Sequence, residues 1–256
     1  MPSENLSPGE YLQHPDRGLK LVSVENARDL GGYPTRAGGL TQWRRFVRTA
    51  DMHELSPTDS EALADYGIRT VMDLRMTKEV EAIPNMLGTL GPPLGIELER
   101  HDFWGTRFDA YRSPDKTAHP AKKLADLYSA GLKDSGFVMG AIFSSFAEEK
   151  PGGFAFHCRS GKDRTGLVAA LLLDLVGVPR EIITADFALT SQYLAGEAIN
   201  PIEPTAPGAW QRTCEEETMA RTLQFLDAEF GGTQGYLREQ GVTADALEVV
   251  GAKLLR

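Results

Sequence analysis

The chain of 256 residues is 41% apolar and 25% charged, so it can build a packed core, and wholesale disorder is excluded. Lysine and arginine number 27 against 36 aspartates and glutamates, and the net charge of −9 argues against general binding of nucleic acid or an anionic membrane. No apolar run reaches the ~20 residues that a membrane helix needs, and residues 1–10 show no secretory signal. We therefore expect a cytoplasmic protein without stable membrane insertion, while non-classical secretion stays open.

The first half of the chain alternates short apolar runs with helix-forming stretches. Residues 1–20 are polar and contain three prolines, which predicts an extended N-terminal arm. A serine cap at position 56, a proline at position 57 and a glycine at position 67 predict a helix between them. Three prolines and two glycines predict a loop over residues 83–93. The runs that predict strands are residues 22–24, 33–35, 43–48, 68–74 and 96–98.

The second half is dominated by helical patterns around one short buried strand, residues 154–157. An aromatic, proline-containing stretch predicts an insertion near residues 103–136, which is either a lid over a site or a cover for the core. Three prolines in residues 200–207 predict a linker. The helical stretches are residues 124–132, 137–150, 164–177, 179–193, 213–230 and 243–254. Strands that alternate with helices predict an α/β fold with a mostly parallel central sheet.

The most informative stretch is residues 157–166, which read His-Cys-Arg-Ser-Gly-Lys-Asp-Arg-Thr-Gly. Cys158 lies where the buried strand ends, and a buried helix begins near Arg164, so the residues between them form a tight loop. The N–H groups of such a loop can point inward and form an anion nest, to which the helix N-terminus adds its positive end. Arg159, Lys162 and Arg164 add three cations against a single carboxylate, which locally reverses the negative field of the chain.

The same field acts on the Cys158 thiol, which we expect to be a thiolate at neutral pH. A thiolate held against a phosphate-shaped nest is a nucleophile directed at phosphorus. The planar guanidinium of Arg164 can bind two phosphoryl oxygens at once, and Thr165 is placed to hydrogen-bond the sulfur. These residues in this order therefore predict phosphoryl transfer through cysteine. An inert buried thiol is the alternative for Cys158, because free cysteine is often a small core residue.

Residues 157–166 resemble the signature of the protein tyrosine phosphatase superfamily, in which His-Cys is followed by five residues, an arginine and a serine or threonine. The Gly-Lys-Asp-Arg-Thr-Gly ending is similar to a bacterial branch, that of the mycobacterial protein tyrosine phosphatase B type. Further segments are similar to motifs of that branch: residues 26–32 (Asn-Ala-Arg-Asp-Leu-Gly-Gly), residues 71–75 (Val-Met-Asp-Leu-Arg) with Glu79, and residues 235–241. The resemblance extends over residues 22–254.

The resemblance implies a three-layer phosphotyrosine phosphatase-like fold, with a single phosphatase domain over residues 21–256 after the arm at 1–20. It implies a two-step reaction without metal or cofactor, in which Cys158 forms a phosphocysteine that water then hydrolyses. It also implies a phosphorylated protein or a phosphoinositide as substrate, with phosphate or another oxyanion in the site. The residues expected to bind phosphate are Arg159, Ser160, Gly161, Lys162, Asp163 and Arg164.

Two residues are candidates for the general acid that protonates the leaving oxygen. Asp102 follows the strand predicted at residues 96–98 and best matches the mobile-loop aspartate of many superfamily members. Asp163 lies inside the signature and is therefore close to the phosphate. Lys162 resembles the basic loop residue of branches that accept phosphoinositides or several phosphoamino acids. The sequence leaves open both the acid and the choice among phosphotyrosine, phosphoserine, phosphothreonine and phosphoinositide.

Two other functions use a similar site. A catalytically weak binding module would hold phosphorylated partners, but such a module does not need Cys158, Arg164 and Thr165 together. A thiol-dependent arsenate reductase or a rhodanese-like enzyme also places a cysteine in an anion nest, although the Arg-Thr-Gly ending counts against this function.

Several polar residues near the motifs have structural interpretations. His157 is expected to orient the loop through a backbone hydrogen bond, and Cys214 is expected to be structural. Four charged residues are expected to form ion pairs that brace the loop from below, in preference to a catalytic role: Arg28, Asp29, Asp73 and Arg75.

Overall fold

A five-stranded sheet forms the centre of the computed structural model, which describes residues 7–104, 117–194 and 209–255. The strand order is β1-β2-β5-β3-β4, and the β1–β2 pair is antiparallel while the other pairs are parallel. The strands are β1 (Arg28–Asp29), β2 (Phe46–Thr49), β3 (Ile68–Asp73), β4 (Glu97–Arg100) and β5 (Gly153–His157). The mostly parallel sheet expected from the sequence is confirmed, with β5 at its centre.

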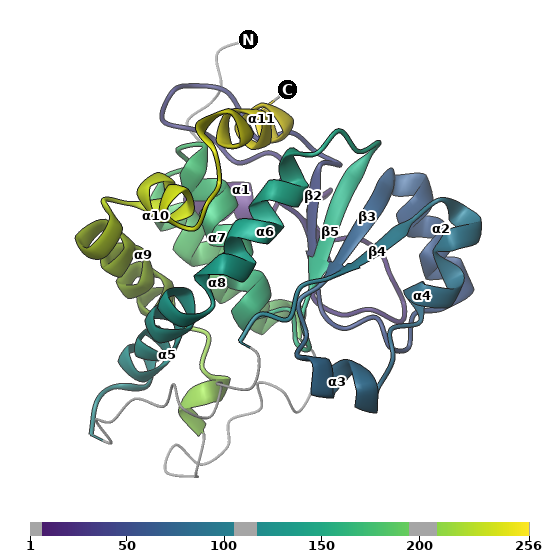
Figure 1. Cartoon of the computed structure of the whole chain (residues 1–256), viewed down its shortest axis with the longest axis horizontal. Coiled ribbons are helices and arrows are strands. Elements are labelled where there is room, and N and C mark those ends of the chain that lie inside the picture. Colours follow the sequence, from purple (N-terminus) through teal and green to yellow (C-terminus); the bar gives the residue numbers. More distant parts are fainter. Residues whose placement is uncertain (1–6, 105–116, 195–208, 256) are drawn as a thin grey trace.

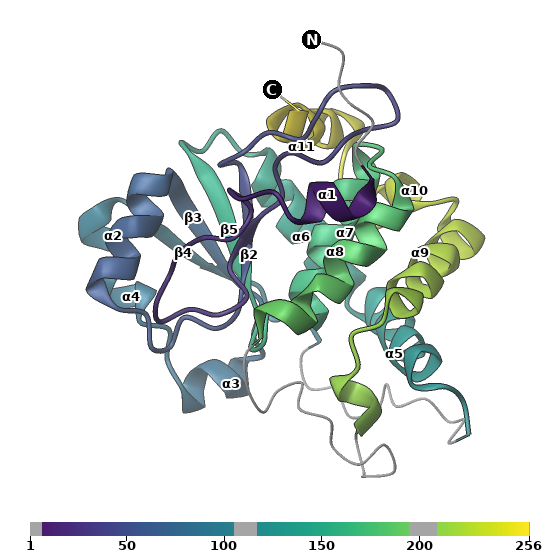
Figure 2. The same ribbon diagram turned by 180° about the vertical axis from the view of Figure 1, so that it is seen from behind.

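Helices cover both faces of this sheet, as Figure 1 shows from one side and Figure 2 from behind. One face packs against α2 (Pro57–Tyr66) and α4 (Leu87–Leu90), while α3 (Thr77–Ala82) lies beyond one end of the sheet. A larger group of helices covers the other face, which gives the three layers expected. These helices are α5 (Pro120–Asp134), α6 (Gly136–Ala147), α7 (Asp163–Leu175), α8 (Arg180–Tyr193), α9 (Glu216–Phe230), α10 (Thr233–Glu239) and α11 (Ala244–Leu255).

Side chains alternate between the two faces along each central strand. Phe46, Phe154 and Phe156 point into the larger core, where the rings of Phe46 and Phe154 stack with centroids 5.6 Å apart. Val47 and Ala155, their chain neighbours, belong to the smaller core beneath α2 and α4. β2 and β5 are therefore buried on both faces, as expected for parallel strands between two helical layers.

The helix predicted between positions 56 and 67 shows how local sequence sets the ends of an element. The Ser56 hydroxyl accepts a hydrogen bond from the Asp59 N–H, and Pro57 occupies the first helical position. Gly67 ends the helix at φ 100°, a left-handed conformation that favours glycine. β3 begins at the next residue, Ile68, so both predictions are confirmed.

Several segments differ from the sequence-based prediction. The arm predicted as extended contains α1 (Pro8–Leu12), a short helix that packs against α8. Residues 22–24 form no strand, because the first two N–H groups of this segment donate to the carboxylate of Asp59 instead of to a neighbouring strand. Residues 83–93, predicted as a loop, contain α4 and a short 3-10 helix, η1 (Pro92–Leu94).

The strand predicted at residues 33–35 is reduced to a single bridge between Pro34 and Leu40. The pattern does not predict α10, which is only seven residues long. The central part of the predicted insertion, residues 105–116, and the predicted linker at 200–207 lie outside the described residues. None of the helices that the structure describes has the length and apolar character needed to cross a membrane.

Candidate active site

The loop after β5 begins where three parallel strands end together. β5 ends at His157, which pairs in register with Thr49 of β2 and Asp73 of β3. Cys158 follows at once and is buried in the larger core, and α7 begins at Asp163. Ligands of open α/β sheets bind at this edge, beyond the carboxyl ends of the strands.

Hydrogen bonds from outside the loop hold its carbonyl groups. The carbonyl oxygens of Arg159, Ser160 and Gly161 each accept a hydrogen bond of 2.9 Å. The donors are, in the same order, the Asp51 N–H, Asn26 Nδ2 and Arg48 Nη2. In the described parts of the chain, no acceptor meets the N–H groups of residues 159–162. Because the carbonyl groups are bonded outward, the N–H groups remain for an anion, which is the arrangement of a backbone nest.

Gly161 allows the loop to approach the sheet closely. Its φ of +67° lies in the left-handed region that favours glycine. A Cβ at this position would lie 2.3 Å from the carbonyl oxygen of Thr49, at the end of β2. A larger residue would therefore push the loop away from the strand whose Arg48 holds it.

Arg164 projects from the first turn of α7 and has one hydrogen-bonded side and one unused donor. Nη1 and Nη2 bond the two carboxylate oxygens of Glu79 at 2.5 and 3.0 Å, and Nη1 also lies 3.3 Å from Leu74 O. Nε is buried and meets no hydrogen-bond acceptor among the described residues. Burial lowers the pKa of the guanidinium, but the negative charges of Cys158 and Glu79 outweigh burial and raise the pKa above its usual range. A fixed guanidinium with an unused N–H is suited to hold a phosphoryl oxygen.

Thr165 carries a second unused polar group beside the loop. The residue is fully buried, and its Oγ1 has no hydrogen-bond partner within the portion of the chain that the structure describes. The hydrogen bond to the sulfur of Cys158 that the sequence predicts is therefore not formed in this structure, although buried hydroxyl groups are nearly always paired.

His157 holds the loop from the strand side. Its Nδ1 lies 3.0 Å from the carbonyl oxygen of Cys158 and donates to it, because a carbonyl oxygen can only accept. Its Nε2 lies 2.9 Å from Asn85 Nδ2 and 3.7 Å from the Asp73 carboxylate. These contacts agree with the orienting role expected from the sequence.

The charged residues expected to brace the loop separate into different clusters. In the first, Asp73 accepts from Nε and Nη2 of Arg75 at 2.9 and 2.7 Å, and Arg75 Nη1 reaches Asp51 at 2.9 Å. Burial alone would raise the pKa of the Asp73 carboxyl, but neighbouring His157 and the bonds from Arg75 lower it to about 2. This cluster fixes Asp51, whose N–H holds the carbonyl group of Arg159.

The second cluster ties α8 to the loop. Asp186 lies 3.0 Å from Arg28 Nε and 2.6 Å from Arg48 Nη1, and all three side chains are buried. Burial would raise the pKa of Asp186, but the two arginines lower it below its usual range. Arg48 also donates to Gly161 O, so the cluster supports the loop directly. Asp29 lies elsewhere and accepts from the N–H groups of residues 31 and 44.

A cleft of about 470 Å³ opens at the loop. Arg159, Ser160, Asp163 and Arg164 contribute its loop side. Another part of the lining is apolar and consists of Met76, Trp104, Leu124, Leu127 and Leu194. The remaining described lining residues are Glu25, Ala50, Asp51, His53, Glu79 and Gln211. The cleft therefore combines an anion site with an apolar surface large enough for a ring.

The two candidate acids lie in different surroundings. Asp163 lines the cleft at the start of α7, and the Tyr128 hydroxyl donates to its Oδ1 at 2.5 Å. Asp102 Oδ2 accepts from the N–H and the hydroxyl of Thr77, at 2.8 and 2.7 Å, where α3 begins. Among the described residues that line the cleft, Asp163 is present and Asp102 is not.

The Lys162 side chain is buried beside the cleft and is not part of its lining. It is 4% exposed, and its Nζ donates to the carbonyl oxygens of Gln211 and Thr213, at 2.5 and 3.0 Å. Gln211 belongs to the short 3-10 helix η3 (Ala209–Arg212). The lysine therefore anchors the segment before α9, which is not the headgroup contact expected of it, while its N–H stays part of the nest.

Cys214 follows the segment that Lys162 anchors. Its Sγ donates to Phe187 O at 3.0 Å, and burial raises the pKa of its thiol to about 11. A thiol that stays protonated and bonded to a carbonyl group has the structural character expected from the sequence.

Sequence reasoning missed three residues that shape the site: Arg48, Asp186 and Tyr128. Arg48 is the only charged residue of β2, and Asp186 is the only charged residue among the buried residues of α8. A lone charge in a buried run signals a partner elsewhere in the chain. Nothing in one sequence says which distant residue that partner is.

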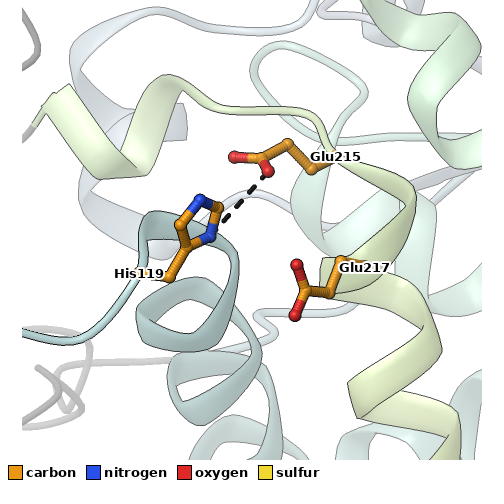
Figure 3. A group of neighbouring side chains, drawn as sticks. All are labelled: His119, Glu215 and Glu217. Atoms are coloured by element: carbon orange, nitrogen blue, oxygen red, sulfur yellow. Dashed lines mark ion pairs between the residues drawn. The ribbon is translucent and has the colours of Figure 1, made fainter.

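The described residues include a group of side chains that could together hold a metal ion, namely His119, Glu215 and Glu217 (Figure 3). Their ligand atoms lie within 4.8 Å of one another, at the starts of α5 and α9. His119 Nδ1 already accepts from the Ala121 N–H, and Glu217 is paired with Arg221. These residues do not line the cleft, and we assign no ion to them.

Comparison with known proteins agrees with a loop and cleft suited to a phosphoryl group. Residues 19–256 match the model of a tyrosine phosphatase family. A tyrosine-protein phosphatase of Nostoc commune is 31% identical over 222 residues, which cover 82% of this chain and 74% of the relative. A Cupriavidus necator protein provisionally named tyrosine-protein phosphatase is 26% identical over 253 residues, which cover 92% of this chain and 86% of the relative.

A shorter match joins the chain to the triple specificity protein phosphatase PtpB of Mycobacterium tuberculosis. The two are 30% identical over 105 residues, which cover 34% of this chain and 38% of PtpB. The family model, in contrast, extends over almost the whole chain and includes the loop after β5. The chain therefore belongs to the tyrosine phosphatase family and is a phosphoric monoester hydrolase.

Proposed function

We propose that the protein is a cysteine-dependent phosphatase that hydrolyses phosphotyrosine through a phosphocysteine intermediate. Cys158 is the nucleophile, Arg164 and the loop amides hold the phosphoryl group, and Asp163 is the general acid. The observation that carries this proposal is the set of unused donors around Cys158: the N–H groups of residues 159–162, Arg164 Nε and Thr165 Oγ1, none with a partner among the described residues. A bound phosphoryl group would satisfy the N–H groups and Arg164 Nε.

In the first step, Cys158 Sγ attacks phosphorus, and the bond between phosphorus and the ester oxygen breaks. The leaving oxygen takes the proton of Asp163 and departs as a neutral phenol. The loop N–H groups and Arg164 stabilise the charge on the equatorial oxygens. Arg164 does this without reorganising, because Glu79 already fixes its plane.

In the second step, water attacks the phosphorus of the phosphocysteine. Asp163, now a carboxylate, takes a proton from the water, and the bond between sulfur and phosphorus breaks. The products are inorganic phosphate and the Cys158 thiolate. Thr165 Oγ1 donates a hydrogen bond to the departing sulfur, which makes the thiolate a better leaving group.

The lining of the cleft favours phosphotyrosine over a phosphoinositide. A tyrosine ring can lie against the apolar surface that includes Met76, Trp104 and Leu127. A polyphosphorylated headgroup would need further cations, yet the Lys162 ammonium is already bonded to the carbonyl groups of Gln211 and Thr213. The names of the Nostoc and Cupriavidus relatives support the same substrate class.

The proposal is tested with three variants. Cys158→Ser should abolish turnover of 4-nitrophenyl phosphate while phosphotyrosine peptide binding survives; full turnover would contradict the proposal. Asp163→Asn should flatten the limb of the pH–rate profile that reports the general acid, and it should slow phenyl phosphate far more than 4-nitrophenyl phosphate, by about 100-fold or more. Asp102→Asn is the matched control and should change neither the pH–rate profile nor the dependence on the leaving group. If Asp102→Asn changes both and Asp163→Asn changes neither, the general acid is Asp102.

A further inference from the structure

A buried tyrosine of α5 contacts the catalytic loop through its hydroxyl. Tyr128 is 0% exposed, and its Oη donates to Asp163 Oδ1 at 2.5 Å. The phenol is held by an edge contact with Phe187, at 6.1 Å between ring centroids, and a tilted contact with Trp104, at 6.3 Å. The hydroxyl therefore cannot move away from the carboxylate without disturbing the core.

This hydrogen bond makes the two carboxylate oxygens of Asp163 different from each other. Oδ1 takes the bond from Tyr128, and Lys162 Nζ lies 3.4 Å from the same atom. Among the described residues, no donor meets Oδ2. Because Asp163 lines the cleft, Oδ2 is the oxygen free to carry a proton to a substrate.

The hydroxyl is a donor throughout the working pH range of such an enzyme. Burial and the negative charge of Asp163 raise the pKa of Tyr128 well above its usual value, so the phenol keeps its proton. The titratable and charged groups around this pair come from the loop, α7 and the segment before α9. They are Cys158, Lys162, Arg164 and Cys214.

We propose that Tyr128 is a positioning residue for the reaction, which fixes the Asp163 carboxyl so that its Oδ2 faces the leaving oxygen. This inference rests on the proposed function, in which Asp163 is the general acid. Removal of the Tyr128 hydroxyl should therefore impair proton donation to the leaving oxygen.

The test is Tyr128→Phe, which removes one oxygen and keeps the ring. We expect kcat/KM for phenyl phosphate, whose leaving group is poor, to fall about tenfold, because a hydrogen bond to a charged group is lost. For 4-nitrophenyl phosphate, whose leaving group is good, we expect a change of less than about twofold.

Tyr236→Phe is the matched control. Tyr236 is also fully buried, and its hydroxyl donates to Leu132 O of α5 at 3.0 Å, away from the loop. Each variant loses one buried hydrogen bond that involves α5, so the unfolding temperature should fall by a similar amount in both. Only Tyr128→Phe should change the leaving-group dependence.

A double variant separates this inference from the proposed function. In an Asp163→Asn background, adding Tyr128→Phe should change kcat/KM by less than about twofold, because the two residues act through one proton. If Asp163→Asn impairs phenyl phosphate hydrolysis while Tyr128→Phe behaves like Tyr236→Phe, the role of Tyr128 is wrong and the proposed acid stands. If Asp163→Asn leaves the leaving-group dependence unchanged, the acid assignment fails and the role of Tyr128 fails with it.

Discussion

At the scale of single residues, two cations of one loop have different tasks. Arg164 has a carboxylate on one side and a buried, unused N–H, so its charge remains available to the cleft. Lys162 donates to two backbone carbonyl groups and lies next to Asp163, so its ammonium group holds residues 211–213 in place. The sequence predicts that both bind phosphate and does not distinguish them, because the direction of a long side chain depends on contacts that spacing does not reveal.

Lys162→Ala should therefore act on the position of residues 211–213 and not on one class of substrate. We expect kcat/KM to fall by a similar factor, about tenfold, for phosphotyrosine peptides and phosphoinositides, since bonds to a charged group are lost. Lys78→Ala, an exposed lysine of α3, is the control and should change neither. A loss confined to phosphoinositides would show that Lys162 reads the headgroup, in favour of a lipid substrate.

At the scale of elements, the loop is held by parts of the chain that are distant in sequence. β2 contributes Arg48, the turn before β1 contributes Asn26, and the residue pair after β2 contributes Asp51. Asp186 adds α8 to this support through Arg48. The shape of the loop is therefore a property of its surroundings as much as of its own residues.

Gly161→Ala tests how strictly the loop depends on its contact with β2. The added Cβ would meet Thr49 O at 2.3 Å, in a backbone conformation that itself costs an alanine roughly 1–2 kcal/mol. We expect a loss of phosphatase activity together with a lower unfolding temperature. Gly177→Ala is the control, because Gly177 has φ +76° but no atom within 4 Å of an added Cβ. It should show the conformational cost alone, with activity retained.

Local signals in the sequence predict elements well where the ends of an element are set within a few residues. Ser56, Pro57 and Gly67 define α2, and the sequence places the strand before Cys158 and the helix after it within one residue or two. The sequence fails at residues 22–24, where the deciding group is the distant Asp59 carboxylate. The same limit hides the pairing of Arg48 with Asp186, since their positions are 138 residues apart.

At the scale of the whole molecule, a net charge of −9 coexists with a cationic loop. Several of the carboxylates are buried ion-pair partners, so the charge is not only a surface property. Asp73 and Asp186 are both nearly inaccessible, and each has a pKa below its usual value. The protein therefore depends on these groups staying ionised.

The pH dependence of stability follows from Asp73. Its pKa falls from 3.8 to about 2 on folding, so its contribution is fully present above pH ~4 and is lost as the pH falls through about 2. Asp73→Asn should lower the free energy of unfolding by about 2 kcal/mol at pH 7, and the deficit should shrink by about half at pH 3. Urea unfolding at the two pH values measures this. Asp65→Asn, an exposed residue of α2, should show a small and pH-independent effect; a constant deficit for Asp73→Asn would contradict the argument.

The inward N–H groups of the loop have a consequence for the end of the catalytic cycle. In the proposed mechanism they bind equatorial phosphoryl oxygens, and inorganic phosphate presents the same oxygens as the substrate does. Once hydrolysis is complete, the product is therefore held by the groups that held the substrate, without the ring to add affinity. We therefore expect product release to compete with chemistry as the slow step, and we expect inorganic phosphate in solution to inhibit turnover. The same ion, by binding only the folded chain, would also protect that chain against unfolding.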